Sequence, residues 1–391
     1  MRNSGSQIVI AGYAETPIVL RSGRSAYDLA GEALAALLQA TEVRKQEIDG
    51  FCATASISEG CNPFFAANLA ELFGLTLDWM NLASIGGASF LSGVAAAASA
   101  IRDARCRLVV VLGADAPSTA NRMAAAAYVS EFQEPVGLTR PAEAFGLIMK
   151  AYEARHDLRY EALAKIATTQ RAAALLNPNA VARLRQPLTE EQYLSSRMIA
   201  DPLRLLDSVM FCDGANAVLV TTEEEARSRG FQKLVRVISY AERSNQAGSE
   251  MQPDILETGF RVAGRRALER ACLAANDVDM LQAYDDFTIA VLLQLEEMGF
   301  CGLGEGSDFI MSNDISWRGA FPINTGGGQL SAGQPGLASG GLPFIEAVRQ
   351  LRGEAGERQV ARASNSLVTG IGGISHGCSW LMSNAMVLEA L

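Results

Sequence analysis

The sequence predicts an α/β fold that is built from two similar halves and arranged in five layers. A strand–helix–strand alternation opens the chain, and a matching alternation begins again near residue 231. Between the first strands lies the stretch GVAAAASAI, which forms a helix with almost no polar face. Such a helix is expected to be buried on all sides, in a middle layer between two sheets.

The first half, residues 1–230, alternates strands with helices. Ser25 is a suitable N-cap for the first helix, because its hydroxyl can accept a hydrogen bond from the first turn. The predicted elements are strand Ile8–Gly12, helix Ser25–Ala40, strand Ile48–Ala55, helix Phe64–Phe73, strand Met80–Ala83, helix Ala88–Asp103, strand Leu108–Leu112, strand Ala215–Thr222 and helix Glu223–Arg229.

Residues from about 115 to 200 interrupt this alternation and are predicted to form an insertion or lid, with helices at Ala142–His156 and Tyr160–Leu176. The second half, residues 231–391, repeats the order of the first. Its predicted elements are strand Leu234–Tyr240, helix Gly259–Ala275, strand Met280–Ala283, helix Pro343–Leu351, strand Arg362–Val368 and a closing strand that ends at Leu388.

Composition excludes several classes of function. A formal net charge of -10 argues against nucleic-acid binding, which needs an excess of basic residues on one face. No apolar run has the roughly 18 residues of a membrane span, and the first residues lack the pattern of a signal peptide. The seven cysteines are scattered singly and only two histidines are present, so no metal site or disulfide framework is indicated. We expect a cytoplasmic protein with reduced thiols.

Several motifs, taken in order and at their spacing, resemble the thiolase superfamily. They are CDGANAVLV (Cys212–Val220), YDDFT with LLQLEEMGFCGLGEG (Tyr284–Gly306), NTGGGQLSAGQPG (Asn324–Gly336), EAVRQLRGEAGERQV (Glu346–Val360) and the GGAS turn before the alanine-rich helix. The resemblance is to the branch of sterol-carrier-type thiolases and lipid-transfer-protein-like aldolases. It implies the thiolase-like five-layered αβαβα fold over nearly the whole chain.

The resemblance also implies a changed active site. Thiolases carry a nucleophilic cysteine at the start of the first buried helix, and the alignment puts Gly87 there. The histidine of their GHP motif falls at Gln334, and their second cysteine falls at Gly370, before Gly372 and Gly373. Because a glycine cannot form an acyl-enzyme, ordinary acyl transfer through that position is not expected. Gly87, Gly372 and Gly373 are the predicted contacts of the coenzyme A (CoA) thioester.

The remaining chemistry centres on Tyr284, which stands where the family has the Asn or His of its NEAF or HDCF motif, as in the lipid-transfer-like aldolases. Its phenol could donate to an enolate or accept a hydroxyl proton; otherwise it packs at a strand end. His376, beside a glycine-rich turn, is the favoured base or else an interface residue. Asp286 is an acid–base candidate or a turn cap.

Further candidates have weaker chemistry. Gln334 cannot exchange a proton and could only orient a carbonyl or a water. Ser89 is either a helix cap or a nucleophile. Three cysteines, Cys61, Cys301 and Cys378, count as candidate thiols only if a loop brings one to the site, and otherwise they are buried and inert. His156 is expected to be a solvated surface residue.

Three functions follow from the resemblance. The first is retro-aldol cleavage, or the reverse, of a β-hydroxyacyl-CoA without an acyl-cysteine intermediate. The second is acyl transfer by Claisen chemistry, and the third is a non-catalytic subunit that binds lipid-CoA and supports a partner. No covalently bound cofactor is expected, since CoA is part of the substrate. The family also implies a homodimer formed through the sheet of the first half and, for some members, a small zinc-ribbon and OB-fold partner.

Overall fold

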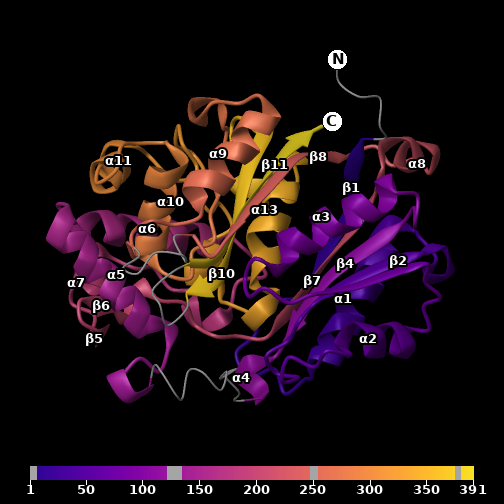
Figure 1. The fold of residues 1–391 in the computed structure, drawn as a ribbon, viewed down its shortest axis with the longest axis horizontal. Helices are drawn as coiled ribbons and strands as arrows, with labels where there is room; N and C mark the ends of the chain where they lie inside the picture. Colours follow the sequence, from indigo (N-terminus) through magenta and orange to yellow (C-terminus); the bar gives the residue numbers. More distant parts are fainter. Residues whose placement is uncertain (1–6, 121–133, 247–253, 375–379) are drawn as a thin grey trace.

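The computed structural model describes residues 7–120, 134–246, 254–374 and 380–391. Nine strands form one hydrogen-bonded sheet in the order β3-β2-β4-β7-β1-β8-β11-β10-β9. The first five belong to the first half and the last four to the second. The two sets join only where β1 and β8 pair at Val9–Arg236 and Ile10–Val235. Figure 1 shows the two sets on opposite sides of the central helices.

In the first half, Ser25 caps the first helix as predicted, because its side chain accepts from the backbone N–H of Asp28. The elements are β1 (Ile8–Glu15), α1 (Ala26–Thr41), η1 (Lys45–Glu47), β2 (Gly50–Thr54), α2 (Phe65–Phe73), β3 (Trp79–Ala83), α3 (Ser89–Arg102), β4 (Val109–Asp115), α4 (Pro117–Ala120), η3 (Glu134–Val136), α5 (Pro141–Arg155), α6 (Tyr160–Leu175), η4 (Ala182–Leu184), α7 (Glu190–Leu194), β5 (Met198–Ala200), β6 (Leu203–Arg204), η5 (Leu205–Asp207), β7 (Gly214–Thr222) and α8 (Glu223–Ser228).

The second half contains β8 (Val235–Ser244), α9 (Phe260–Ala271), η6 (Ala275–Asp277), β9 (Leu281–Gln282), α10 (Thr288–Met298), α11 (Gly306–Ser312), α12 (Gly328–Ala332), η7 (Gly336–Gly340), α13 (Gly341–Leu351), η8 (Gly356–Arg358), β10 (Asn365–Ile374) and β11 (Trp380–Ala390). The predicted helix Gly259–Ala275 was too long, because Cys272 adopts a left-handed conformation that ends α9. No helix was predicted at Thr288–Met298, where the structure has α10 with every residue buried.

The two halves share one topology, as predicted. In the first, β2 is parallel to β3 and β4, whereas β4, β7 and β1 follow antiparallel. In the second, β9 is parallel to β10, while β10, β11 and β8 follow antiparallel. A single parallel bridge between Leu281 and Ile323 stands where the second half would have its counterpart of β3. The repeat therefore extends to the order and direction of the strands.

The five layers are confirmed. Helices α1 and α2 cover the outer face of the first set of strands, and α9 and α10 belong to the outer layer of the second. Between the sets lie α3 and α13, each of which contacts strands of both halves. A core cluster with residues of α3, α13 and strands of both halves fills this middle layer. The insertion helices α5 and α6 pack against the second half, beside α10 and α11 (Figure 1).

The expectation that the alanine-rich helix is buried on all sides was wrong for one face of α3. Ser99 is exposed, and Ser92, Ala95 and Ala96 are only partly covered in the monomer. The other faces pack against β2, β3, β4 and β7 on one side and β10 and β11 on the other. A strip of small residues thus remains accessible beside the edge strand β3.

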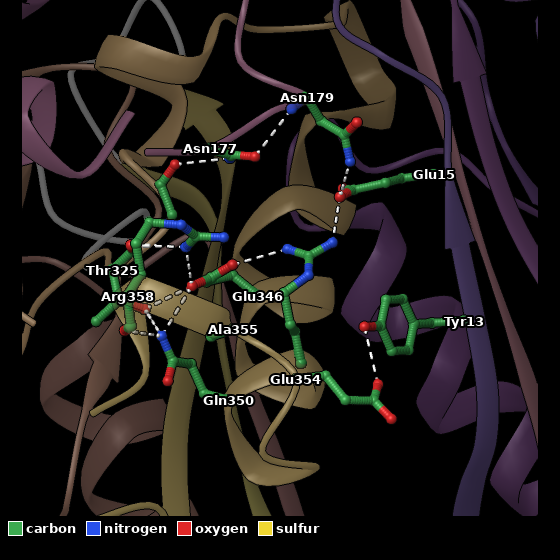
Figure 2. A network of polar contacts seen from close by, with 12 residues as sticks. Tyr13, Glu15, Asn177, Asn179, Thr325, Glu346, Gln350, Glu354, Ala355 and Arg358 are labelled. Carbon is green, nitrogen blue, oxygen red and sulfur yellow. Dashed lines mark hydrogen bonds and ion pairs between the residues drawn. The ribbon is translucent and has the colours of Figure 1, made fainter. Parts of the chain in front are cut away.

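A buried network of charged side chains ties the middle layer together (Figure 2). Glu346 of α13 pairs with Arg349 at 2.8 Å and with Arg358, and Arg349 pairs in turn with Glu15 of β1. Thr325 donates to Glu346 at 2.9 Å. Burial alone would raise the pKa of Glu346, but the two guanidinium groups lower it, so the carboxylate stays ionised. Because Arg349 pairs with Glu15, this network links the two halves.

None of the helices within the described ranges is both long enough and apolar enough to cross a membrane.

Replacing Glu346 by Gln is expected to lower the free energy of unfolding by about 3–5 kcal/mol, because two buried guanidinium groups lose their shared partner. Urea denaturation monitored by circular dichroism measures the change. Glu32→Gln is the matched control, since Glu32 pairs with Arg24 at the surface and should cost less than about 1 kcal/mol. Equal losses in the two variants would contradict this account of the network.

Candidate active site

Tyr284 lies two residues after the end of β9, where its main chain is held on both sides. Its N–H donates to the Thr369 hydroxyl of β10 at 2.8 Å, and its carbonyl accepts from the Gln294 side chain of α10 at 2.8 Å. The Thr369 hydroxyl donates to the same Gln294 amide, which closes the ring of contacts. Asn324 accepts from the N–H of Ala283, one residue earlier, at 2.7 Å. These contacts fix the direction in which the phenol leaves the strand.

The phenol of Tyr284 is buried and hydrogen-bonded. Its oxygen lies 2.8 Å from the Ser339 hydroxyl, and the Gln334 amide nitrogen donates to it over a longer 3.5 Å. The same Gln334 nitrogen donates to the Gln329 side chain at 3.0 Å. Burial, and then the charge of nearby Asp286, raises the pKa of Tyr284 above its ordinary value. The phenol therefore keeps its proton at neutral pH and is able to donate it in a hydrogen bond.

Gly87 stands against this phenol at the start of α3. A Cβ placed on Gly87 would lie 2.0 Å from the Tyr284 hydroxyl oxygen and 2.1 Å from Cζ. Carbon atoms essentially never approach so closely. Gly87 has no positive φ, so the backbone itself would accept a side chain. The glycine is required because the tyrosine fills the space that a side chain at position 87 would use.

The turn that carries Gly87 packs main chain against main chain on β10. A Cβ on Gly86, which has φ +62°, would lie 2.1 Å from the carbonyl oxygen of Gly372. A Cβ on Gly370 would lie 3.0 Å from Cα of Ala88, and one on Gly372 would lie 2.9 Å from the Ile85 carbonyl oxygen. These glycines let the start of α3 approach β10. Gly373, with φ +122°, follows in the same strand.

Ser89 is fully buried and its hydroxyl is engaged within the same turn. The hydroxyl donates to the Gly86 carbonyl at 2.6 Å and accepts from the Ile85 N–H at 2.9 Å. The prediction that Ser89 caps the helix was wrong, because the N-cap of α3 is Ala88, which makes no side-chain cap, and the Ser89 hydroxyl bonds within the preceding turn. A nucleophilic serine needs a general base beside its hydroxyl, and in the described part of the chain the hydroxyl of Ser89 contacts only these two backbone groups.

Asp285 and Asp286 differ in their surroundings. Asp285 accepts from the N–H groups of Gln329 and Leu330 at the start of α12, at 2.9 and 3.3 Å. Burial raises the pKa of Asp285 to about 6 despite these donors. Oδ1 of Asp286 is buried without a partner among the described residues. Burial, and then the charge of Asp285, raises the pKa of Asp286 to about 8. The pair is therefore best described as an ionised Asp285 beside a protonated Asp286.

Ser339 was not among the predicted site residues. It lies in η7, whose glycines approach the start of α3 so closely that a Cβ on Gly340 would lie 2.4 Å from the Gly87 carbonyl oxygen. The internal repeat could have pointed to Ser339. Helices α3 and α13 occupy equivalent places in the two halves, so the residues just before α13 are expected to lie near those just before α3. Gln329 was also missed; its side chain accepts from Gln334, and its N–H donates to Asp285.

Three of the described thiols are made poor nucleophiles by burial. Burial raises the pKa of Cys52, of Cys212 and of Cys301 to about 12 in each case. Cys61 is exposed, and its pKa is also raised by partial burial. Cys378 lies outside the described residues, as does His376, the predicted base.

His156 is not the solvated residue that the sequence suggested. It ends α5, is half-buried, and packs with its ring centroid 5.0 Å from that of Tyr152. A Cβ on Gly304 would lie 2.4 Å from its Nδ1, so His156 belongs to the packing of the insertion.

Comparisons with known proteins agree with the fold. Residues 241–383 match the family described as "Thiolase C-terminal domain-like". The chain is 31% identical to a 17-hydroxy-3-oxo-4-pregnene-20-carboxyl-CoA lyase of Mycobacterium tuberculosis, over 93% of this chain and 96% of the relative. It is 30% identical to a steroid side-chain-cleaving aldolase of Thermomonospora curvata, over 92% and 94%. The solved Ltp2-ChsH2(DUF35) aldolase superposes with a TM-score of 0.85, at 28% identity and 98% coverage of both chains.

Substituting Ala for Gly87 is expected to lower the free energy of unfolding by about 1–3 kcal/mol, because the new methyl group overlaps the Tyr284 ring. In a Tyr284→Ala background the same substitution should cost little, since the ring is gone. A double-mutant cycle of urea unfolding measures this coupling.

Gly31→Ala serves as the control for that cycle. A Cβ there would meet Phe73 at an ordinary 3.5 Å inside α1, so no coupling to Tyr284 is expected. A full cost of Gly87→Ala that persists without the tyrosine would contradict the steric explanation.

Asp286→Asn is expected to become progressively more stable than the parent chain as pH rises. The folded pKa is about 8, whereas an unfolded Asp titrates near ~4. The stability that protonated Asp286 contributes is fully present below the unfolded pKa and is lost as pH rises through the folded value. Urea unfolding at pH 5 and pH 9 measures the free energy of unfolding of both chains. The value for the variant relative to the parent should be higher at pH 9 than at pH 5 by at least ~1 kcal/mol. Asp308→Asn is the control, because Asp308 is exposed. If the stability difference between Asp286→Asn and the parent is the same at both pH values, Asp286 is not held protonated in the folded chain.

Proposed function

Since the chain belongs to the thiolase superfamily, we propose that it cleaves the bond between the α and β carbons of a β-hydroxyacyl-CoA thioester in a retro-aldol reaction. One observation carries this proposal. The phenol of Tyr284 fills the place of a side chain at the start of α3, so a proton donor stands where an acyl-enzyme would have to form. The two relatives that match over almost the whole chain are a CoA lyase and an aldolase.

The reaction needs a base at the β-hydroxyl and a donor at the thioester oxygen. The base takes the proton of the hydroxyl, and the bond between the α and β carbons breaks. The β carbon becomes the carbonyl of a ketone or aldehyde, and the electron pair of the broken bond forms the enolate of the thioester. Tyr284, protonated at neutral pH, is the proposed donor to the enolate oxygen. The positive end of the α3 dipole, beside Gly87, favours the same charge. A proton is then returned to the α carbon, which leaves a shortened acyl-CoA.

Gln334 and the acidic pair are assigned supporting roles. Gln334 orients the phenol, because its amide contacts both Tyr284 and Gln329. Asp286 is the proposed second proton donor, since it is held protonated and one of its oxygens is free of partners in the described structure. His376 remains our predicted base. No acyl group is proposed for Ser89, whose hydroxyl is used in the turn.

We propose that CoA enters only as part of the substrate and that the protein acts in the cytoplasm as a homodimer. The edge strand β3 and the accessible strip of α3, with exposed Met80 and Ser99, support a contact through the first half. A DUF35 component is named with the solved aldolase, which supports a small partner subunit for this chain as well. A zinc-ribbon and OB-fold subunit is the kind of partner we propose.

The test is product release from the purified chain, alone and with its partner subunit. The probes are a simple 3-hydroxyacyl-CoA and a 17-hydroxy steroid carboxyl-CoA of the kind named for the mycobacterial relative. Tyr284→Phe should lower kcat about 10²–10⁴-fold, because the enolate loses its donor. Liquid chromatography of the ketone and the acyl-CoA measures turnover.

Tyr152→Phe is the matched control, because Tyr152 is also fully buried and its hydroxyl donates to Glu296. It should retain most of the parent activity. Undiminished turnover by Tyr284→Phe, or an acyl adduct on any cysteine or serine after incubation with acyl-CoA, would overturn the proposal in favour of acyl transfer. Tight CoA-ester binding without turnover would instead favour a non-catalytic subunit.

A further inference from the structure

Ser339 is fully buried in η7, and its hydroxyl lies 2.8 Å from the phenol oxygen of Tyr284. We propose that Ser339 is a positioning residue for Tyr284: its hydroxyl donates to the phenol oxygen and so directs the phenol's own proton toward the substrate. This inference rests on the proposed function, in which Tyr284 gives a hydrogen bond to the enolate.

The proposed direction of the Ser339 hydrogen bond is the one that leaves the phenol proton available to the substrate. A phenol oxygen can accept two hydrogen bonds and has one proton to give. The Gln334 amide nitrogen can only donate to it. If Tyr284 gave its proton to Ser339, no proton would remain for a substrate oxygen. With Ser339 and Gln334 both donating, the phenol proton is the one group left to point into the site.

The first half of the chain fixes where Ser339 stands. Asp115, the last residue of β4, accepts from the Leu337 N–H at 3.0 Å. Asn216 of β7 donates to the Ala338 carbonyl at 2.9 Å. Asp115 also accepts from the N–H groups of Ile57 and Ser58, at 2.8 and 2.9 Å, so this anchor is itself rigid. Tyr284, in contrast, is held by β10 and α10 of the second half.

The contact between Ser339 and Tyr284 therefore joins a hydroxyl placed by one half to a phenol placed by the other. Its charge effect agrees with the proposed direction. Burial raises the pKa of Tyr284, whereas the Ser339 and Gln334 contacts lower it. A donor that stabilises the phenolate oxygen should equally stabilise it as the proton moves toward the substrate.

The experiment replaces Tyr284 in the full chain by 3,5-difluorotyrosine, whose fluorine atoms give an NMR signal that no other tyrosine shares. The 19F chemical shift is then titrated against pH in the parent and in Ser339→Ala. Loss of the donor is expected to raise the midpoint by about one to two pH units. Ser366→Ala is the matched control, because Ser366 is equally buried and its hydroxyl contacts the Met280 carbonyl; it should leave the midpoint unchanged.

An unchanged or lowered midpoint in folded Ser339→Ala overturns the inference. Should that variant fail to fold, Ser339→Cys provides the same test, since a thiol is a weaker donor and a smaller upward shift is expected. The titration uses no substrate. If the midpoint rises in Ser339→Ala but Tyr284→Phe is fully active, only the proposed function is contradicted. If the midpoint does not change and Tyr284→Phe is inactive, only this inference is contradicted.

Discussion

The structure depends on one steric constraint, which is that the ring of Tyr284 and a side chain at position 87 cannot occupy the same place. Everything near the start of α3 is consistent with that exclusion. The main chain of Tyr284 is held by Thr369 and Gln294, and its hydroxyl contacts Ser339 and Gln334. The turn before α3 is pressed onto β10 and cannot move away. A change of chemistry at this position therefore requires a pair of substitutions.

The site also depends on the meeting of the two halves. Each half sends one long central helix into the middle layer, and the starts of these helices face each other at Gly87 and Gly340. Neither half holds the whole site, because Tyr284 and Ser339 are positioned by different strands. Shape, hydrogen bonding and charge at the phenol are thus set by contacts that are distant in the sequence.

The sequence was sufficient for the architecture because its signals are local and repeated. The cap at Ser25, the apolar strands and the alanine-rich helix each predict an element, and their order in both halves predicts the layers. It also pointed to Tyr284, Asp286 and Gln334. It could not show that Gly87 is excluded from bearing a side chain by Tyr284, since that depends on a three-dimensional distance. Ser339 was missed for the same reason, and the accessible face of α3 was missed because small residues carry no polar signal of exposure.

The ion network around Glu346 has a consequence for the ancestry of the fold. If two equivalent units were once fused, each must at first have formed a centre of its own. Arg349 now pairs with Glu15, which belongs to the opposite unit (Figure 2). A separated C-terminal piece would leave that guanidinium without one of its counter-charges and would uncover the face of α13 that packs against β1 and β7. The duplicated arrangement has in this sense become irreversible, and later divergence could remodel the site only within a chain that keeps both units together.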